Sequence, residues 1–506
     1  MIVAHDLGTS GDKASLHDRS GRLVATCTVG YPTRFAAGGV AEQDPRDWER
    51  AVGEATRRLL AQAGVAGAAV TGVVLSGQMM GAVFLDRRGE PLRPAFIWAD
   101  DRSIAQAERL RDALGAERAY ALLGHRVHAT YPLPKMMWVR DHEPRTWAAT
   151  RAVCVAKDFV TARLTGRLVT DPSDASSTDA FDLVAGRWSP EALTAADVDP
   201  ALLPEVVPST SIAGGLLPEP AERLGLPRGT PVVVGGGDGP VASVGAGAVD
   251  PSDGAYVCLG SSAWVAFSAL RPVLDPLQRS FTFRHVVPER FVPTATMQAG
   301  GAALEWVADV VDPSPSPDRI GRLLAEAGAA RAAEDGLFFL PYLLGERSPH
   351  WDATATGTFV GLRRHHTRGD LVRAVLEGVA FNLRSCLAAF PGSRDQLGSV
   401  DVIGGGATSD VWMQVLADVW GIPVRRRSIV DAANSLGAAV TGLVALGEAG
   451  FSLARDLSQV TAAFEPDPDR AAAYAAGHGR FVDAYARLAG WPGTGSLPRP
   501  PAREDR

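Results

Sequence analysis

Lysine and cysteine are scarce in this sequence of 506 residues. Only three of the 50 basic residues are lysine, so the other 47 are arginine. The cysteines stand far apart and form no Cys-x-x-Cys pair, so neither a disulfide framework nor a zinc knuckle is indicated. We expect core or near-core thiols at Cys27, Cys154, Cys258 and Cys386.

Excess positive charge and long apolar runs are also lacking. The 50 basic and 57 acidic residues give a net charge of −7, which argues against a broad surface for nucleic acid or an anionic membrane. No apolar run approaches the roughly 20 residues of a membrane span, and no secretory signal pattern is visible. We therefore expect a soluble, cytoplasmic protein whose partners are small neutral or phosphorylated molecules.

The strong preference for arginine makes the retained lysines informative. Where either a lysine or an arginine side chain would serve, such a bias favours arginine. Lys13, Lys135 and Lys157 are therefore candidates for places that need a compact ammonium group rather than a planar guanidinium.

Apolar runs and glycine turns alternate in a way that indicates an α/β protein. At about 150 residues per domain, the length allows two to four domains. Short runs rich in valine that end in glycine are typical of strands buried on both faces. The expected strands are 2–4, 13–18, 70–75, 232–234, 257–259 and 401–403, and the expected helices are 44–63, started by Asp44 and Pro45, and 411–419.

A weak internal repeat indicates two similar halves. The turn at residues 6–10, between two strands, recurs at 259–262 between two later strands. We set the boundary near residue 247, which gives a domain 1–247, a domain 248–490 and a mobile tail 491–506. The proline-rich stretch 313–317 is expected to be an exposed loop.

Three glycine turns carry groups that suit nucleotide phosphates. Residues 6–13 supply glycines for close approach, hydroxyls for phosphate oxygens and, in Asp6, a carboxylate that could hold Mg²⁺. Alone, this segment could equally be a hairpin turn with a capping aspartate. Residues 259–262 repeat it, and 404–407 offer backbone for a base or ribose, so together they favour nucleotide binding. Neither a P-loop nor a dinucleotide-binding pattern occurs.

Asp238 lies in the glycine run 235–239, between a buried strand and a helix expected to start near Pro240. A carboxylate there can accept the proton of a hydroxyl that attacks a phosphoryl group. An ordinary helix N-cap is the alternative interpretation.

Residues 76–81 follow a buried strand and present an amide beside two thioethers. The amide belongs to Gln78, and the thioethers belong to Met79 and Met80. A sugar site is one interpretation, and filling of gaps in the core by the methionines is the other.

Residues 97–102 combine an aromatic plate with charged groups, as sugar sites commonly do. Trp98 supplies the plate, and Asp100 and Arg102 supply the charges. A surface ion pair beside a buried tryptophan would explain the same residues.

Longer motifs resemble the FGGY carbohydrate kinases, relatives of actin and hexokinase. Residues 357–362, followed after seven residues by 370–377, fit the second signature of that family at every constrained position. Residues 132–139 resemble the first signature, although Thr130 departs from it, and 171–176 and 340–349 also resemble family segments. The resemblance covers roughly residues 2–490 and is strongest to the xylulokinases.

The resemblance implies two actin-like (ribonuclease H-like) α/β domains, with ATP and sugar in a cleft between them. The N-terminal domain would hold mainly sugar and the C-terminal domain mainly nucleotide. The implied reaction converts D-xylulose to D-xylulose 5-phosphate, with Asp238 as general base and Mg²⁺ at Asp6 and Asp238. We predict that ATP contacts Thr9, Ser10, Lys13, Gly260, Ser261, Ser262, Gly404, Gly405, Gly406 and Ser409. We predict that the sugar contacts Gln78, Met79, Met80, Trp98, Asp100, Arg102 and Asp238.

Two departures from the xylulokinase pattern leave the substrate open. Xylulokinases carry Gln-Met-His-Gly where this chain has Met80, so a hydrogen-bonding imidazole is replaced by a thioether. The pair Gly239-Pro240 after the expected base also differs. Another ketose or a polyol (ribulose, erythritol or glycerol) is the competing substrate class, and a non-catalytic actin-like nucleotide-binding protein or a sugar-binding regulator is the competing kind of protein. The family also suggests a homodimer.

Overall fold

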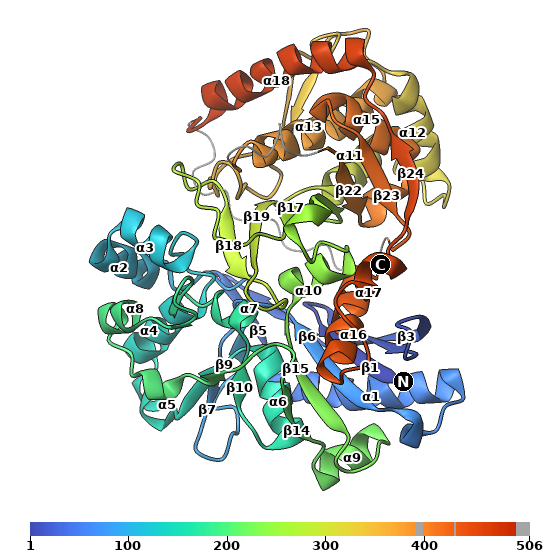
Figure 1. Cartoon of the computed structure of the whole chain (residues 1–506). Helices are drawn as coiled ribbons and strands as arrows, with labels where there is room; N and C mark the ends of the chain where they lie inside the picture. The colour runs from blue at the N-terminus through green and yellow to red at the C-terminus, as the bar shows by residue number, and fades with distance from the viewer. Residues whose placement is uncertain (391–397, 430–431, 492–506) are drawn as a thin grey trace. The chain divides into compact units, whose positions relative to one another are not determined.

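A computed structural model describes residues 1–390, 398–429 and 432–491, which form two compact units (Figure 1). Unit 1 comprises residues 1–256 and 266–294 together with the described part of 427–460, and unit 2 comprises 257–265, the described part of 295–426 and the described residues from 461 onward. The division predicted at residue 247 and the cleft between domains stay predictions. Of the predicted tail, residues 492–506 lie outside the described part of the chain.

Unit 1 is built on a six-stranded sheet in the order β14-β15-β6-β1-β2-β3. These strands are β1 (Ile2–Leu7), β2 (Gly11–His17), β3 (Leu23–Gly30), β6 (Gly72–Gly77), β14 (Ile212–Gly215) and β15 (Pro231–Gly237). β6 runs parallel to both β1 and β15, whereas β2, β3 and β14 pair antiparallel with their neighbours. The four strands expected in this part of the chain are confirmed, with bounds that differ by a few residues.

The strand register places three strand ends side by side. Leu7 at the end of β1 pairs with Gly77 at the end of β6, and Gly77 pairs in turn with Gly237 at the end of β15. The turns that follow these strands therefore leave the sheet at one edge. In open α/β sheets, ligands bind outside the carboxyl ends of parallel strands.

Helices cover both faces of this sheet. Alternate residues of β1, β6 and β15 point to opposite faces, as strand geometry requires. On one face, Val3, Val73 and Val232 share a core cluster with α1 (Pro45–Ala63) and α6 (Ala156–Thr165). On the other face, Ile2, Val74 and Val233 share one with α10 (Asp238–Gly245) and α16 (Ala433–Ala445), which lie next to each other in Figure 1. The predicted first helix is confirmed as α1. Asp44 is its N-cap, because the Asp44 side chain accepts a hydrogen bond from the backbone N–H of Arg46.

Other elements of unit 1 extend this frame. Short strands include β4 (Arg34–Ala36), β5 (Val40–Gln43), β7 (Val83–Leu85), β8 (Ala95–Phe96), β9 (Ala152–Cys154), β10 (Val169–Thr170), β11 (Phe181–Asp182), β12 (Arg187–Trp188), β13 (Glu205–Val206) and β18 (Phe281–Arg284). The helices are α2 (Ile104–Leu114), α3 (Ala116–Leu123), α4 (Pro132–His142), α5 (Pro144–Ala149), α7 (Pro172–Ala175), α8 (Pro190–Ala196), α9 (Pro218–Leu224) and α17 (Leu453–Leu457). β5 and β8 pair antiparallel, and β5 carries Glu42 and Gln43, which belong to the site described below.

Unit 2 combines a second sheet with long helices. The strands that lie wholly in unit 2 are β20 (Phe338–Leu340), β21 (Thr358–Val360) and β22 (Val400–Ile403). Residues of both units contribute to β16 (Ala255–Leu259), β17 (Ala263–Phe267), β19 (Phe291–Met297), β23 (Val424–Arg427) and β24 (Val460–Phe464). The helices of unit 2 include α11 (Gly301–Val311), α12 (Arg319–Ala329), α13 (Arg368–Leu387), α15 (Asp410–Trp420) and α18 (Pro468–Leu488). β16, β22 and α15 confirm the expected strands and helix, and residues 313–317 form the expected loop between α11 and α12.

Two further expectations concern cysteines and membrane spans. Cys154 and Cys386 are buried, Cys27 and Cys258 are partly buried, and all four are free thiols, as predicted. Among the described residues, no helix is both long and apolar enough to cross a membrane.

Candidate active site

Asp6 lies near the end of β1, and only one of its two carboxylate oxygens has a hydrogen-bond partner among the described residues. Its Oδ2 accepts a hydrogen bond of 3.1 Å from Nδ2 of Asn434 in the first turn of α16. Its Oδ1 is buried without a hydrogen-bond partner among the described residues. Burial raises the pKa of Asp6 to about 6, while Asn434 and Lys13, which pairs with Asp6 across β1 and β2, oppose that rise.

The free oxygen of Asp6 fits a divalent cation. Mg²⁺ is usually held by one or two carboxylates together with substrate phosphates rather than by a cage made only of protein groups. The described residues include no group of three or more His, Cys, Asp or Glu side chains that could hold a metal ion by themselves. A magnesium ion here would therefore depend on the phosphates of a nucleotide.

Asp238 is the first residue of α10 and follows directly on the end of β15. Gly237, rather than Asp238, stands at the N-cap position, and Oδ1 of Asp238 accepts a 2.8 Å hydrogen bond from the Gly239 N–H. Burial, followed by the nearby charge of Asp6, raises the pKa of Asp238 to about 7. A carboxylate with a pKa near neutrality is suited to act as a general base.

A buried group of charges lies beneath this turn. Nζ of the fully buried Lys157 is 2.8 Å from Asp158 Oδ1, 3.3 Å from Asp171 Oδ1 and 3.4 Å from Asp174 Oδ2. Oγ of Ser173 donates to Asp171 and accepts a 3.0 Å hydrogen bond from the N–H of Gly237. Ser173 therefore connects the charged cluster to Gly237, the residue just before Asp238.

Gln78, in the predicted sugar turn, is linked to the predicted phosphate turn through Gln43 of β5. Nε2 of Gln78 donates to Oε1 of Gln43 at 2.8 Å, and Nε2 of Gln43 donates to the carbonyl oxygen of Thr9 at 2.6 Å. Nε1 of Trp98 donates to Oγ1 of Thr9 at 2.9 Å. Three predicted site residues therefore meet here, and Oε1 of Gln78 is buried without a partner among the described residues.

The two methionines of the sugar turn have different environments. Met79 is buried, and a Cβ atom placed on Gly237 would lie only 2.6 Å from Met79 Cγ. Met79 therefore fills a core gap beside the turn of Asp238. Met80 is partly exposed and has a φ angle of 65°, a left-handed conformation that is uncommon for residues other than glycine.

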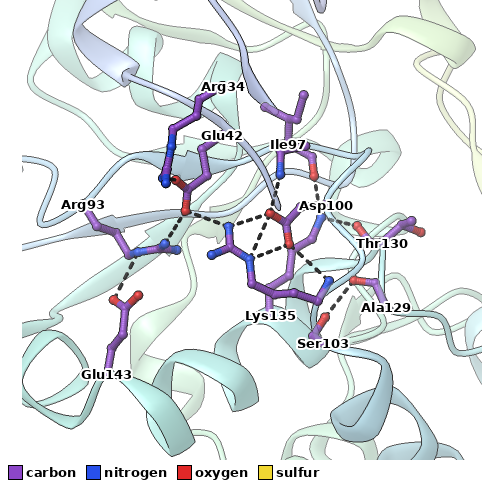
Figure 2. A network of polar contacts seen from close by, with 12 residues as sticks. Arg34, Glu42, Arg93, Ile97, Asp100, Ser103, Ala129, Thr130, Lys135 and Glu143 are labelled. Atoms are coloured by element: carbon purple, nitrogen blue, oxygen red, sulfur yellow. Dashed lines mark hydrogen bonds and ion pairs between the residues drawn. The ribbon is translucent and has the colours of Figure 1, made fainter. Parts of the chain in front are cut away.

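The buried Asp100 and the partly buried Arg102 form an ion pair that is largely shielded from solvent. Nη2 of Arg102 donates to Asp100 Oδ2 and to Glu42 Oε1, each at 2.6 Å, and Arg93 donates to the same Glu42 oxygen at 2.6 Å. Figure 2 shows Glu42 between Arg34 and Arg93, with Asp100 beside Lys135. Asp100 is fully buried, so it serves as an anchor, and its contact with sugar stays a prediction.

The predicted nucleotide residues of unit 2 occupy two glycine turns. Gly260, Ser261 and Ser262 connect β16 to β17, and the N–H groups of Gly300 and Gly301 bind the carbonyl oxygens of Ser261 and Gly260. A Cβ on Gly404, which has a φ of 91°, would lie 2.6 Å from the Leu259 backbone, and one on Gly406 would lie 2.5 Å from the Leu259 side chain. A Cβ on Gly405 would meet nothing within 4 Å.

Ser409, Ser10 and Lys13 complete the predicted ATP contacts. Oγ of Ser409 accepts a hydrogen bond from the N–H of Trp412 and caps α15, while Ser10 and Lys13 are exposed. Their contacts with ATP stay predictions, as do those of Thr9 and the glycine turns.

Sequence reasoning missed Gln43 and Asn434 as site residues, although one signal was available for Asn434. The chain contains only two asparagines, Asn382 and Asn434. Each donates to a buried carboxylate: Asn434 to Asp6, and Asn382 to Oε2 of Glu346 at 3.0 Å. Gln43 follows no comparable pattern.

Comparison with known proteins supplies the family. The model described as "FGGY family of carbohydrate kinases, N-terminal domain" matches residues 1–245, and the model of the C-terminal domain matches 255–446. A xylulose kinase of Escherichia coli (strain K12) is 34% identical over 491 residues, covering 96% of this chain and 99% of its own. A gluconokinase of Bacillus subtilis (strain 168) is 30% identical over 482 residues, covering 94% and 93%.

Solved structures of xylulose kinases share the fold of this chain. A ligand-bound xylulose kinase from Lactobacillus acidophilus superposes with a TM-score of 0.91 at 27% identity, covering 98% of this chain and 99% of that one. A second structure, from Brucella ovis, has a TM-score of 0.88 at 32% identity, covering 96% and 99%. The expected two-domain, actin-like fold is thereby confirmed. This chain belongs to the FGGY family of carbohydrate kinases.

Proposed function

We propose that this protein transfers the γ-phosphoryl group of ATP to D-xylulose and so forms D-xylulose 5-phosphate. The observation that carries the proposal is the position of Asp238. It follows the end of β15, in register with the end of β6, from which the turn of Gln78 and Met80 departs. Xylulose kinases among the relatives support the choice of sugar.

The proposed chemistry needs one proton acceptor. Asp238 accepts the proton of the attacking sugar hydroxyl while that oxygen forms a bond to the γ-phosphorus. The bond from the γ-phosphorus to the bridging oxygen breaks, and ADP leaves with the electron pair. Because the transition state of phosphoryl transfer is loose, alignment and charge neutralisation contribute most of the catalysis.

Four side chains of unit 1 are suited to hold the reactants. Oε1 of Gln78, which has no hydrogen-bond partner among the described residues, can accept a hydrogen bond from a sugar hydroxyl, and Trp98, which donates to Thr9, offers an aromatic ring. Asp6, with Asp238 as second carboxylate, would hold Mg²⁺. When bound, Mg²⁺ neutralises charge on the phosphates.

A kinase for a different ketose, polyol or sugar acid is the second candidate. Met80 favours it, because a thioether cannot replace the hydrogen bonds of the histidine that xylulokinases carry. A gluconokinase is also among the relatives of at least 30% identity.

The test is ADP release with Mg²⁺ and ATP across D-xylulose, L-xylulose, D-ribulose, L-ribulose, glycerol, erythritol, D-gluconate and a blank without sugar. Preference for D-xylulose supports the first candidate, and preference for another compound supports the second. ATP binding without sugar-stimulated turnover would instead indicate a non-catalytic nucleotide-binding protein. The predicted homodimer is tested separately by light scattering on the purified chain.

A further inference from the structure

Lys135 of α4 is fully buried and makes three hydrogen bonds to backbone carbonyl oxygens. Its Nζ donates to the carbonyl of Met80 at 2.8 Å, to that of Ile97 at 2.8 Å and to that of Thr130 at 2.5 Å. Figure 2 shows the lysine pointing into the space between Ile97 and Thr130. Within the described part of the chain, the hydrogen-bond acceptors of Lys135 Nζ are these three carbonyl oxygens, with no carboxylate at ion-pair distance.

The chemistry of the ammonium group explains why a lysine stands here. An ammonium group carries three N–H donors that diverge from one nitrogen, and each is matched by one carbonyl oxygen. A guanidinium group is planar and spreads its donors over three nitrogens, so arginine cannot satisfy the same three oxygens. In a chain with 47 arginines, one of only three lysines occupies this position.

The three carbonyls belong to segments that are distant in sequence. Met80 lies in the turn after β6, Ile97 follows β8, and Thr130 precedes α4. The segment after Ile97 is itself held firmly, because Asp100 and Arg102 join the ion-pair network around Glu42 (Figure 2). Lys135 therefore connects a turn to a rigid frame.

The turn needs such a connection because of its backbone conformation. Met80 has a φ angle of 65°, in the left-handed region that residues other than glycine rarely adopt. The hydrogen bond from Nζ of Lys135 to the Met80 carbonyl fixes the peptide group that follows this angle. Release of that carbonyl would let the turn relax toward a more common conformation.

We propose that Lys135 is a positioning residue that holds the carbonyl of Met80, and with it the turn at residues 78–81, in the orientation that binds sugar. The inference rests on the proposed function, because it takes this turn to face the sugar. Lys135 is buried and contacts backbone carbonyls, so it acts on sugar binding through the turn of Met80 and not by direct contact with the sugar.

The first test compares Lys135→Met with Lys157→Met, a matched control at the other fully buried lysine of unit 1. Lys135→Met should raise the KM for sugar about ten-fold or more and change the KM for ATP by less than about two-fold. Lys157→Met should lower stability without a selective rise in the KM for sugar. Equal effects of Lys135→Met on both KM values, or none on either, would overturn the proposal.

The second test requires no kinase activity. Hydrogen exchange followed by mass spectrometry should show faster exchange in peptides covering residues 76–82 in Lys135→Met, and unchanged exchange in α1. Unchanged exchange at 76–82 would overturn the positioning role. If exchange changes as expected but the wild-type chain phosphorylates no sugar, the proposed function fails and the connection made by Lys135 stands.

A milder variant keeps the proposal testable should Lys135→Met not fold. Lys135→Gln retains two N–H donors on a neutral, shorter side chain. It should raise the KM for sugar and the exchange rate of residues 76–82 above the wild-type values while leaving the KM for ATP unchanged. Wild-type values for Lys135→Gln in both measurements would overturn the proposal.

Discussion

Asn434 and Asp6 are 428 residues apart in sequence, yet Nδ2 of Asn434 lies 3.1 Å from Oδ2 of Asp6. The contact joins the first turn of α16 to β1 within unit 1. It fixes the orientation of the carboxylate and leaves Oδ1 available. An amide suits this position because it donates a hydrogen bond without adding a charge that would compete with a cation.

Replacement of Asn434 by alanine should weaken the use of magnesium. A hydrogen bond to a charged group is worth about 1.5–3 kcal/mol, so kcat should fall by about ten-fold or more and the Mg²⁺ concentration for half-maximal rate should rise. The measurement is ADP release across a Mg²⁺ titration. Asn382→Ala is the control, because it removes the other asparagine–carboxylate contact. An unchanged Mg²⁺ dependence in Asn434→Ala would contradict the assignment.

Replacement of Lys157 by methionine should destabilise unit 1. It leaves Asp158, Asp171 and Asp174 buried without their shared cation, and loss of one member of a buried ion cluster costs about 3–5 kcal/mol. Urea unfolding measures the change. The double variant Lys157→Met with Asp174→Asn should recover part of the lost unfolding free energy, because it removes one of the carboxylates left without a cation. A loss below about 1 kcal/mol would show that the cluster does not depend on this lysine.

Glu346 of unit 2 should make stability depend on pH. Burial raises the pKa of this carboxyl group from 4.5 to about 8, even though the N–H groups of Gln298 and Arg347 and the amide of Asn382 favour its charged form. The folded state therefore holds a proton that the unfolded state releases more readily. This contribution to stability is complete below about pH 4.5 and is lost as pH rises through about 8.

Glu346→Gln tests that dependence, because glutamine does not titrate. Unfolding free energies measured from pH 5 to 9 should decline with pH by a smaller amount in the variant than in the wild type. Parallel curves for the two proteins would show that Glu346 does not titrate in this range.

Met80→His should change the order of preferred sugars. The imidazole restores a hydrogen-bonding group worth about 0.5–1.5 kcal/mol, so kcat/KM for D-xylulose should rise by about two- to ten-fold relative to glycerol and erythritol. Histidine also tolerates the left-handed backbone at this position better than most residues. The same order of sugars in variant and wild type would remove Met80 from the determinants of specificity.

Local patterns predicted the strands and helices because their causes are local. The valines of β15 alternate between two buried faces, and Asp44 and Pro45 start α1 through contacts within one turn. The turn at Gly404 was predicted for a similar reason, because glycine favours turns, and its positive φ angle is one that glycine adopts without strain. The predicted strand ended at Ala4 because His5 and Asp6 interrupt the apolar run, although strand pairing continues to Leu7.

The contacts that assemble the site could not be predicted in this way. Asn434 meets Asp6, and Gln43 meets Gln78 and Thr9, only because the fold brings distant segments together. The residue types of Asp100 and Arg102 are compatible with an ion pair at the surface, whereas the structure buries Asp100 and pairs Arg102 with Glu42 of β5 as well. The scarcity of lysine indicated Lys135 and Lys157 as special, without indicating what either contacts.

The most direct test of the central claim compares wild type, Asp238→Ala and Asp238→Asn in two assays on the same preparations. ADP binding by calorimetry reports the nucleotide site, and sugar-dependent ADP release reports turnover with D-xylulose and the other panel compounds. The account predicts that both variants bind ADP as the wild type does when Mg²⁺ is absent, while kcat falls about 10²- to 10⁴-fold, because the proton acceptor and one proposed Mg²⁺ ligand are lost. Turnover that survives in Asp238→Ala would contradict the role of Asp238 as general base.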